Sequence, residues 1–194
     1  TDDASVYLTL YDDAKAVDGD VKNVKITRFS DLETFPYRSG IGIDVHKLVE
    51  NRKLVLGGVE IPFEKGLLGH SDADVLTHAV MDAILTAIGE RDIGVLFPDT
   101  DEKYKGISSM LLLKEVLSRL DMRGYVVKFV SATVACQRPK LNPYFDKIRT
   151  SLSHALSICK DNLSLAFTTT EGLGLVGAGD GISVIASATV VAKQ

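Results

Sequence analysis

The sequence is poor in cysteine and lacks both a long apolar run and an excess of basic residues. A membrane-spanning helix needs about 20 consecutive apolar residues, and no signal peptide opens the chain, so we expect no membrane association. Cys136 and Cys159 do not have the spacing of a disulfide framework, which favours a reducing compartment. Lys and Arg number 22 against 26 Asp and Glu, so we expect no nucleic-acid partner.

The length and composition are those of a folded protein with one or at most two domains. Of the 194 residues, 45% are hydrophobic and 25% are charged. Residues 1–37 differ from the rest because they carry more acidic than basic side chains and are too few to bury a core of their own. The chain also begins at Thr1 without Met, so we expect a fragment or a processed product, with one segment at 1–37 and a main domain at 38–194.

From residue 39 onward, strand-like and helix-like patterns alternate, which predicts an α/β fold. We expect a polar turn at 50–53 to join the first two strands, and loops at 62–69 and 90–106. Ser71 or Asp72 is the expected N-cap of the first long helix. The predicted strands span 40–46, 53–60, 124–135, 163–169 and 181–192, and the predicted helices span 72–89, 108–120 and 143–158.

Two clusters of ionisable residues predict a metal site. Asp44 and His46 lie two apart on a predicted strand, so their side chains point to the same side. His78 shares one face of the predicted helix with Asp74 and Asp82, at spacings of about four residues. A lone histidine on a helix usually lies on a solvated face with its hydrogen bonds made, and it binds no metal. The second cluster favours instead a Zn²⁺ held by Asp44, His46 and His78, with a fourth position open for chemistry.

Three further stretches carry polar groups suited to a phosphorylated ligand. Residues 91–101 are rich in carboxylates and form either a simple turn or a site for polyol hydroxyls. Residues 135–142 follow a strand end and form either a capped turn or a contact for a phosphate or a base edge. Residues 168–171 supply hydroxyls and the Glu171 carboxylate before a glycine-rich loop, a combination that favours phosphate and Mg²⁺ binding.

Together these motifs resemble the 2-C-methyl-D-erythritol 2,4-cyclodiphosphate synthases over residues 38–194. The resemblance implies an α/β (α+β) subunit with a mixed β-sheet and helices packed on one face. It also implies a homotrimer around a central threefold channel, with an active site at each subunit junction. The motifs are Gly-Ile-Asp-Val-His at 42–46, Gly-Gly-Val-Glu-Ile-Pro at 57–62, Gly-Leu-Leu-Gly-His-Ser-Asp-Ala-Asp-Val at 66–75, Asp-Ile-Gly-Val-Leu-Phe-Pro-Asp-Thr-Asp at 92–101 and Thr-Thr-Thr-Glu-Gly-Leu-Gly at 168–174.

The resemblance also implies a role for each matched residue. His70 and Thr169 donate to the charge that develops during the reaction, and Glu171 holds Mg²⁺ or Mn²⁺ beside one Zn²⁺ per chain. Asp92, Gly94 and residues 97–101 hold the erythritol part of the substrate, and residues 136–142 hold its cytidine. The implied substrate contacts are Asp44, His46, His70, Ser71, Asp92, Gly94, Phe97, Asp99, Asp101, Cys136, Lys140, Leu141, Asn142, Thr168, Thr169, Glu171 and Leu175.

The implied reaction belongs to the non-mevalonate isoprenoid pathway. 4-Diphosphocytidyl-2-C-methyl-D-erythritol 2-phosphate cyclises, CMP leaves, and the cyclic diphosphate forms. Residues 1–37 resemble the C-terminal end of 2-C-methyl-D-erythritol 4-phosphate cytidylyltransferase, which implies an upstream domain in a bifunctional enzyme. The expected location is the bacterial cytoplasm or the plastid stroma.

Two other functions remain open from the residues alone. A Zn²⁺-dependent phosphohydrolase would place water at the open metal position, with Asp74 as the candidate base. A nucleotide- or metal-binding module would use the same residues without turnover.

In the predicted strand 181–192, we expect the apolar face made by residues 182, 184, 186, 188 and 190 to surround the threefold axis.

Overall fold

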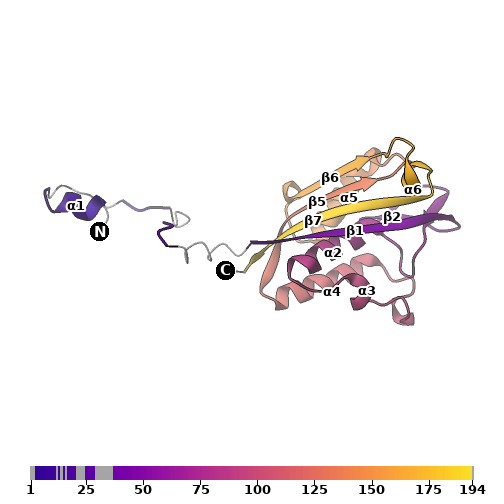
Figure 1. Ribbon diagram of the computed structural model, residues 1–194, viewed down its shortest axis with the longest axis horizontal. Helices are drawn as coiled ribbons and strands as arrows, with labels where there is room; N and C mark the ends of the chain where they lie inside the picture. The colour runs from indigo at the N-terminus through magenta and orange to yellow at the C-terminus, as the bar shows by residue number, and fades with distance from the viewer. Residues whose placement is uncertain are drawn as a thin grey trace. The chain divides into compact units, whose positions relative to one another are not determined.

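The computed structural model describes residues 3–11, 13, 15, 17–20, 25–28 and 37–193. The chain divides into two compact units, Thr1–Phe35 and Pro36–Gln194 (Figure 1). In the first unit, α1 (Asp3–Leu8) is a short helix, and the Tyr7 ring stacks on Tyr11 with centroids 4.8 Å apart. Much of the predicted segment 1–37 lies outside the described residues, so its assignment stays a prediction.

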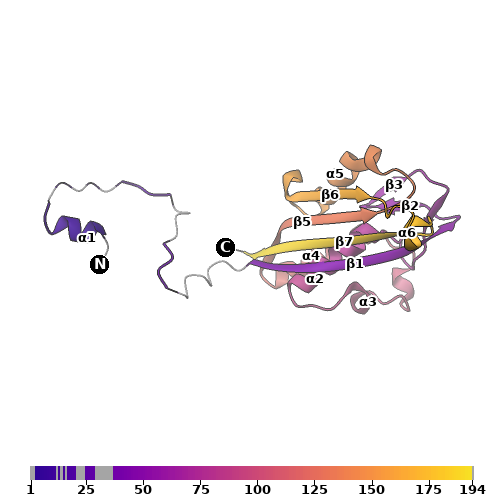
Figure 2. The ribbon, with the colours of Figure 1, turned by 45° about the horizontal axis from the view of Figure 1, so that its top comes forward.

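The second unit is built on a five-stranded mixed sheet in the order β4-β1-β7-β5-β6. The two long strands β1 and β7 run antiparallel side by side through its middle (Figure 2). β5 pairs antiparallel with β7 and parallel with β6. The strands are β1 (Tyr37–Glu50), β4 (Lys65–Leu67), β5 (Tyr125–Ala135), β6 (Leu163–Thr168) and β7 (Gly181–Ala192).

Helices pack on one face of this sheet and form the core with it, which confirms the predicted fold class (Figure 1). They are α2 (Val75–Ala87), α4 (Ser109–Met122) and α5 (Phe145–Ala155). Most side chains of α2 are buried, because the helix lies between the sheet and α4. No helix within the described ranges is long and apolar enough to cross a membrane.

Two glycines allow β1 to lie directly against α2. A Cβ atom on Gly42 would stand 2.1 Å from the carbonyl oxygen of Ala79, and one on Gly40 would stand 2.3 Å from that of Ala83. The inward-facing positions of β1 alternate, so Asp44 and His46 follow the two glycines on the same side. The close approach therefore directs both ligand candidates toward α2.

The N-terminus of α2 is capped by Asp74, so the prediction of Ser71 or Asp72 was wrong. The Asp74 carboxylate accepts hydrogen bonds from the amide and hydroxyl of Thr77, and also from the amides of Gly57 and Gly58. Asp74 is completely buried, so one carboxylate fixes both the helix start and a distant turn. Asp72 is engaged with α4 instead.

Several other element predictions were wrong in the connections. The predicted strand 53–60 is a hairpin of β2 (Leu54–Leu56) and β3 (Val59–Ile61), with Gly57 and Gly58 at positive φ in its turn. β1 pairs with β4 and β7 rather than across the polar turn at 50–53. The predicted loop 62–69 contains β4, and the predicted loop 90–106 contains the short helices α3 (Ile93–Leu96) and η2 (Glu102–Tyr104). The other short helices in the described residues are η3 (Asn142–Tyr144), η4 (Lys160–Asn162) and α6 (Gly174–Gly177).

The structure also reverses the predicted orientation of the last strand. The face of β7 that contains Ile182, Val184 and Val190 is buried inside the chain with α2. The uncovered face contains Ile185, which is 55% exposed. On the neighbouring strand, Ile43 pairs directly with Ile185 and is also exposed. The prediction was wrong because both faces of this strand contain apolar residues, and helix packing decides which face is covered.

Candidate metal centre and active site

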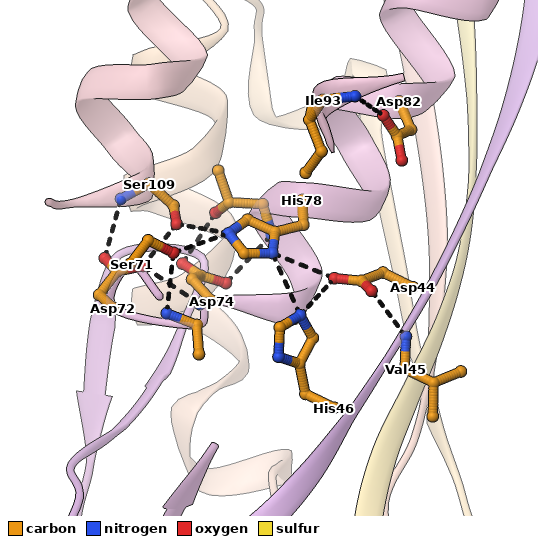
Figure 3. A network of polar contacts seen from close by, with 12 residues as sticks. Asp44, Val45, His46, Ser71, Asp72, Asp74, His78, Asp82, Ile93 and Ser109 are labelled. Carbon is orange, nitrogen blue, oxygen red and sulfur yellow. Dashed lines mark hydrogen bonds and ion pairs between the residues drawn. The ribbon is translucent and has the colours of Figure 1, made fainter. Parts of the chain in front are cut away.

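Asp44, His46 and His78 converge at one point between β1 and α2 (Figure 3). His46 Nε2 lies 2.8 Å from Asp44 Oδ2, and His78 Nδ1 lies 3.1 Å from the same oxygen. The two imidazole nitrogens are 3.3 Å apart. The structure thus brings together the three residues that the sequence predicted as zinc ligands.

The outer nitrogen of each imidazole has its own partner. His46 Nδ1 lies 2.6 Å from the carbonyl oxygen of Leu68. Because a carbonyl only accepts, Nδ1 carries a hydrogen, and Nε2 is the nitrogen that faces Asp44 and is left to bind a cation. His78 Nε2 lies 2.8 Å from the hydroxyl of Ser109, which leaves Nδ1 facing Asp44.

The charges of this cluster favour positive charge beside Asp44, either a proton on an imidazole or a cation. Burial would raise the pKa of Asp44, but hydrogen bonds from His46 and His78 hold it well below the usual range. Burial acts to lower the pKa of His46, but the hydrogen bond and charge of Asp44 outweigh it and raise the pKa. One carboxylate and two imidazoles make a ligand set that suits Zn²⁺ with an open position. The residues present therefore fit such an ion.

A cavity of about 400 Å³ opens beside the three ligand candidates. Of the predicted substrate contacts, five more line this cavity: His70, Ser71, Gly94, Phe97 and Asp99. The sequence analysis did not assign its other lining residues to the site, and these are Gly69, Asp82, Ile93, Tyr104 and Leu112.

Asp92 and Asp101 do not line this cavity with the other predicted contacts. The Asp92 carboxylate caps α3 by accepting from the Val95 amide at 3.2 Å. The Asp101 carboxylate pairs with Lys103 at 3.0 Å, while its backbone oxygen lies 3.1 Å from His70 Nε2. Both aspartates therefore shape the loop, and Asp101 orients His70 through its backbone.

Asp82 connects α2 to the loop that forms the far wall of the cavity. Its carboxylate accepts from the amide of Ile93 at 2.8 Å, and burial raises its pKa (Figure 3). The sequence placed Asp82 on the same helix face as His78 but gave it no role in the site. Its spacing of four residues from His78 was the available signal.

A second cavity, of about 720 Å³, contains the residues predicted to hold the cytidine. Its lining includes Cys136, Lys140, Leu141 and Asn142, together with Thr168 and Thr169. These segments meet because β5 and β6 are parallel and end together, with Ala135 opposite Thr168. Leu141 is buried, and burial raises the pKa of the Cys136 thiol to about 11.

Glu171 lies on the loop beyond β6 and Leu175 lies in α6, and neither residue lines either cavity. The Thr169 hydroxyl donates to the Glu171 carboxylate at 2.7 Å. Glu171 has a φ of 51°, an uncommon conformation for a residue with a side chain. The described part of a single chain thus does not bring Glu171 into the cavity of Asp44, His46 and His78.

Comparisons with known proteins give one consistent family. A model described as the YgbB family matches residues 37–191. The 2-C-methyl-D-erythritol 2,4-cyclodiphosphate synthase of Clostridium acetobutylicum is 58% identical over 146 residues, which cover 75% of this chain and 94% of that protein. The corresponding Clostridium botulinum protein, from strain Alaska E43, is 54% identical over 156 residues, which cover 80% of this chain and 99% of that protein.

Solved structures agree with the sequence relatives. The bifunctional IspDF of Campylobacter jejuni matches with a TM-score of 0.80 and 35% identity, over 100% of this chain and 55% of that chain. This chain therefore spans about half the length of the bifunctional protein. A CDP complex of IspF from Plasmodium falciparum matches with a TM-score of 0.72 and 31% identity, over 82% of this chain and 98% of that chain. The chain belongs to the YgbB family, together with relatives named 2-C-methyl-D-erythritol 2,4-cyclodiphosphate synthase.

Proposed function

We propose that this chain converts 4-diphosphocytidyl-2-C-methyl-D-erythritol 2-phosphate into 2-C-methyl-D-erythritol 2,4-cyclodiphosphate and CMP. The observation that carries the proposal is the convergence of Asp44, His46 and His78 at the edge of a cavity. The names of the close relatives support the same reaction. Phosphoryl transfer between two anionic groups needs positioning and positive charge more than a strong base.

In this proposal, Asp44, His46 and His78 hold one Zn²⁺, and Glu171 holds Mg²⁺ or Mn²⁺. The bound ions supply positive charge that polarises phosphate oxygens and reduces the repulsion between the two phosphates. The attacking 2-phosphate has a second pKa of about 6, so it is already ionised at neutral pH. Its oxygen forms a bond to the β-phosphorus while the bond to CMP breaks.

The chain's own donors orient the substrate. His70 and Ser71 line the cavity and bind the 2-phosphate. The Thr169 hydroxyl, which donates to Glu171 in this structure, turns to donate to the diphosphate when Glu171 binds its cation. Gly94, Phe97 and Asp99 surround the erythritol part. Asp92 and Asp101 act by fixing the loop that contains these residues.

The second cavity is the proposed cytidine site. Cys136, Lys140, Leu141 and Asn142 surround the base and ribose, with Thr168 beside the diphosphate. A related structure is a CDP complex, which supports a cytidine nucleotide in this family. Leu175, in α6, is the remaining proposed substrate contact.

We infer that the working enzyme is a homotrimer whose subunits share active sites around a central channel. The cavity beside Asp44 has no lining residue in common with the cavity beside Thr169, and Glu171 belongs to neither. A second copy that places its Glu171 loop against the first cavity would complete the site. The exposed apolar face of β1 and β7, which includes Ile41, Ile43 and Ile185, is a suitable contact between copies.

The reading of residues 1–37 is also part of this proposal. We propose that they are the end of a cytidylyltransferase domain, because the bifunctional Campylobacter jejuni protein matches along the whole of this chain. The location in the bacterial cytoplasm or the plastid stroma stays a prediction.

The structure disfavours the phosphohydrolase reading, in which Asp74 was the candidate base. Asp74 is completely buried and its carboxylate accepts four hydrogen bonds from Gly57, Gly58 and Thr77. It therefore has no access to a water in the cavity. A hydrolase would release CMP and an open-chain diphosphate, and a binding module would release neither.

Product analysis tests the proposal. Incubation with the cytidylylated substrate and Mg²⁺ should give CMP and a cyclic diphosphate in equal amounts, as seen by phosphorus NMR. His78→Ala should lose zinc and turnover, while His154→Ala, an exposed histidine on α5, should retain both. Glu171→Gln should lose turnover but keep zinc, with Glu115→Gln on α4 as its control. Open-chain product from the wild-type chain would contradict the proposal.

A further inference from the structure

A chain of hydrogen bonds links the outer nitrogen of His78 to a carboxylate outside the cavity (Figure 3). Ser109, completely buried at the start of α4, has its hydroxyl 2.8 Å from His78 Nε2. The same hydroxyl forms a short hydrogen bond with Asp72 Oδ1. Asp72 Oδ2 accepts from the Ser109 amide at 2.9 Å, so the carboxylate is fixed on both sides.

The direction of these hydrogen bonds follows from the chemistry of the groups. An ionised carboxylate only accepts, so the Ser109 hydroxyl donates its hydrogen to Asp72. The hydroxyl oxygen then offers only lone pairs to His78, and Nε2 must carry a ring hydrogen to donate to it. His78 Nδ1 lies 3.1 Å from Asp44 Oδ2 and 3.3 Å from His46 Nε2, so Asp44 and Asp72 compete for the single hydrogen of the neutral ring. A cation beside Asp44 would end this competition, with the hydrogen on Nε2 and the lone pair on Nδ1.

We propose that Asp72 and Ser109 are positioning residues that hold His78 in the tautomer able to bind a metal ion. A hydroxyl alone would not do this, because it donates as readily as it accepts. The Asp72 carboxylate removes that freedom. For His46 the carbonyl oxygen of Leu68 performs the same task directly. The metal itself rests on the proposed function, whereas the tautomer is a property of this chain.

Asp72→Asn separates this role from simple packing. The side-chain oxygen of Asn stays on the Ser109 amide, which is the closer backbone donor at 2.9 Å, compared with 3.2 Å for the amide of Asp74. The Asn amino group then faces the Ser109 hydroxyl and donates to it. The hydroxyl turns to donate to His78 Nε2, so the ring hydrogen moves to Nδ1, where the metal should bind.

Ser109→Ala is predicted to be milder. It leaves His78 Nε2 beside the hydroxyl of Ser71, which lies 3.3 Å away and already accepts from the Ala73 amide at 3.2 Å. The Ser71 hydroxyl can accept the hydrogen on Nε2, so nothing in this variant forces the ring hydrogen to move to Nδ1. The order of the two variants therefore distinguishes an electrostatic relay from loss of a buried contact.

The first measurement is Zn²⁺ affinity of the full chain, by competition with a chromophoric chelator. Removal of an outer hydrogen-bond partner of a metal-binding histidine costs about 10–100-fold in affinity. We expect Asp72→Asn near the upper end and Ser109→Ala near the lower end. Ser108→Ala removes the neighbouring cap of α4 without touching His78 and should bind Zn²⁺ like the wild type. Wild-type affinity in both Asp72→Asn and Ser109→Ala would overturn the proposal.

The second measurement reads the tautomer without any metal. Long-range nitrogen–proton NMR of the zinc-free Asp44→Ala chain, which lacks the competing acceptor beside Nδ1, should show neutral His78 with hydrogen on Nε2. Adding Asp72→Asn to this chain should move the hydrogen to Nδ1. If the wild type binds no Zn²⁺, the proposed metal is wrong, and the tautomer still decides the role of Asp72. An unchanged tautomer in the folded double variant would overturn the role assigned here.

Discussion

Asp74 is expected to be the most important polar side chain for the stability of the metal-binding helix. Its carboxylate caps α2 and binds the amides of Gly57 and Gly58 in the β2–β3 turn, at 2.9 Å and 2.7 Å. Because His78 lies one turn into α2, the same carboxylate fixes the start of the helix that carries a metal ligand. Asp74→Ala removes all these contacts at once.

The expected loss in the free energy of unfolding is the sum of two effects. Loss of an N-cap costs about 1 kcal/mol. A buried amide that loses its partner costs about 1–3 kcal/mol, which applies to Gly57, whereas Gly58 is exposed and its amide can bind water instead. We therefore expect a loss of about 2–4 kcal/mol, in the upper part of the range for single substitutions.

Urea unfolding at fixed chain and zinc concentrations measures this loss, because ligands and oligomers shift the apparent stability. Ser108→Ala is the matched control, since Ser108 caps α4 by accepting only from the amide of Met110. It should cost about 0.5–2 kcal/mol, as expected for a cap alone. If Asp74→Ala costs no more than Ser108→Ala, the turn amides do not depend on Asp74 and the reasoning is refuted.

Three further predictions follow from the packing. Gly42→Ala puts a Cβ atom 2.1 Å from the Ala79 oxygen. It should lower the free energy of unfolding in urea by at least about 1–3 kcal/mol and weaken zinc binding. The control Ser39→Ala, on the same strand, should do neither. At pH 8, the exposed Cys159 should react with a thiol reagent while Cys136 stays unreactive, since burial raises the Cys136 pKa from 9.0 to about 11. The free energy of unfolding should also fall between pH 9 and pH 11, because the Cys136 thiol ionises first in the unfolded chain. Two rapidly reacting thiols per chain would contradict this prediction. A chain that begins at Tyr37 should keep its CMP release and its mass by light scattering, because residues 1–35 form a separate compact unit; loss of either property would show that the segment is structural.

The metal ligands were predictable because their geometry depends on local periodicity. Residues two positions apart on a strand point to the same side, so Asp44 and His46 were paired from the sequence alone. The helical pattern placed His78 on an ionisable face, and the ordered motifs indicated the family. The sequence also identified the segments 135–142 and 168–171 as polar strand ends, and the parallel pairing of β5 and β6 brings them together.

The short-range competition between polar side chains was harder to predict. Ser71, Asp72 and Asp74 are all good helix caps, and the sequence favoured the first two. The fold selects Asp74 because the β2–β3 turn offers it two more amides, while α4 engages Asp72. Ser109 had no sequence signal, since its contact with His78 joins residues 31 positions apart.

The sequence by itself therefore determined which residues share a face, and the tertiary structure decided which face is covered. Period two groups Ile182 with Val184 and, separately, Ile185 with Ser187, but it does not say where a helix will pack. α2 covers the first group because Gly40 and Gly42 on β1 admit it on that side. The same contact brings His78 to Asp44 and His46, so the metal centre exists only after strand and helix have packed together.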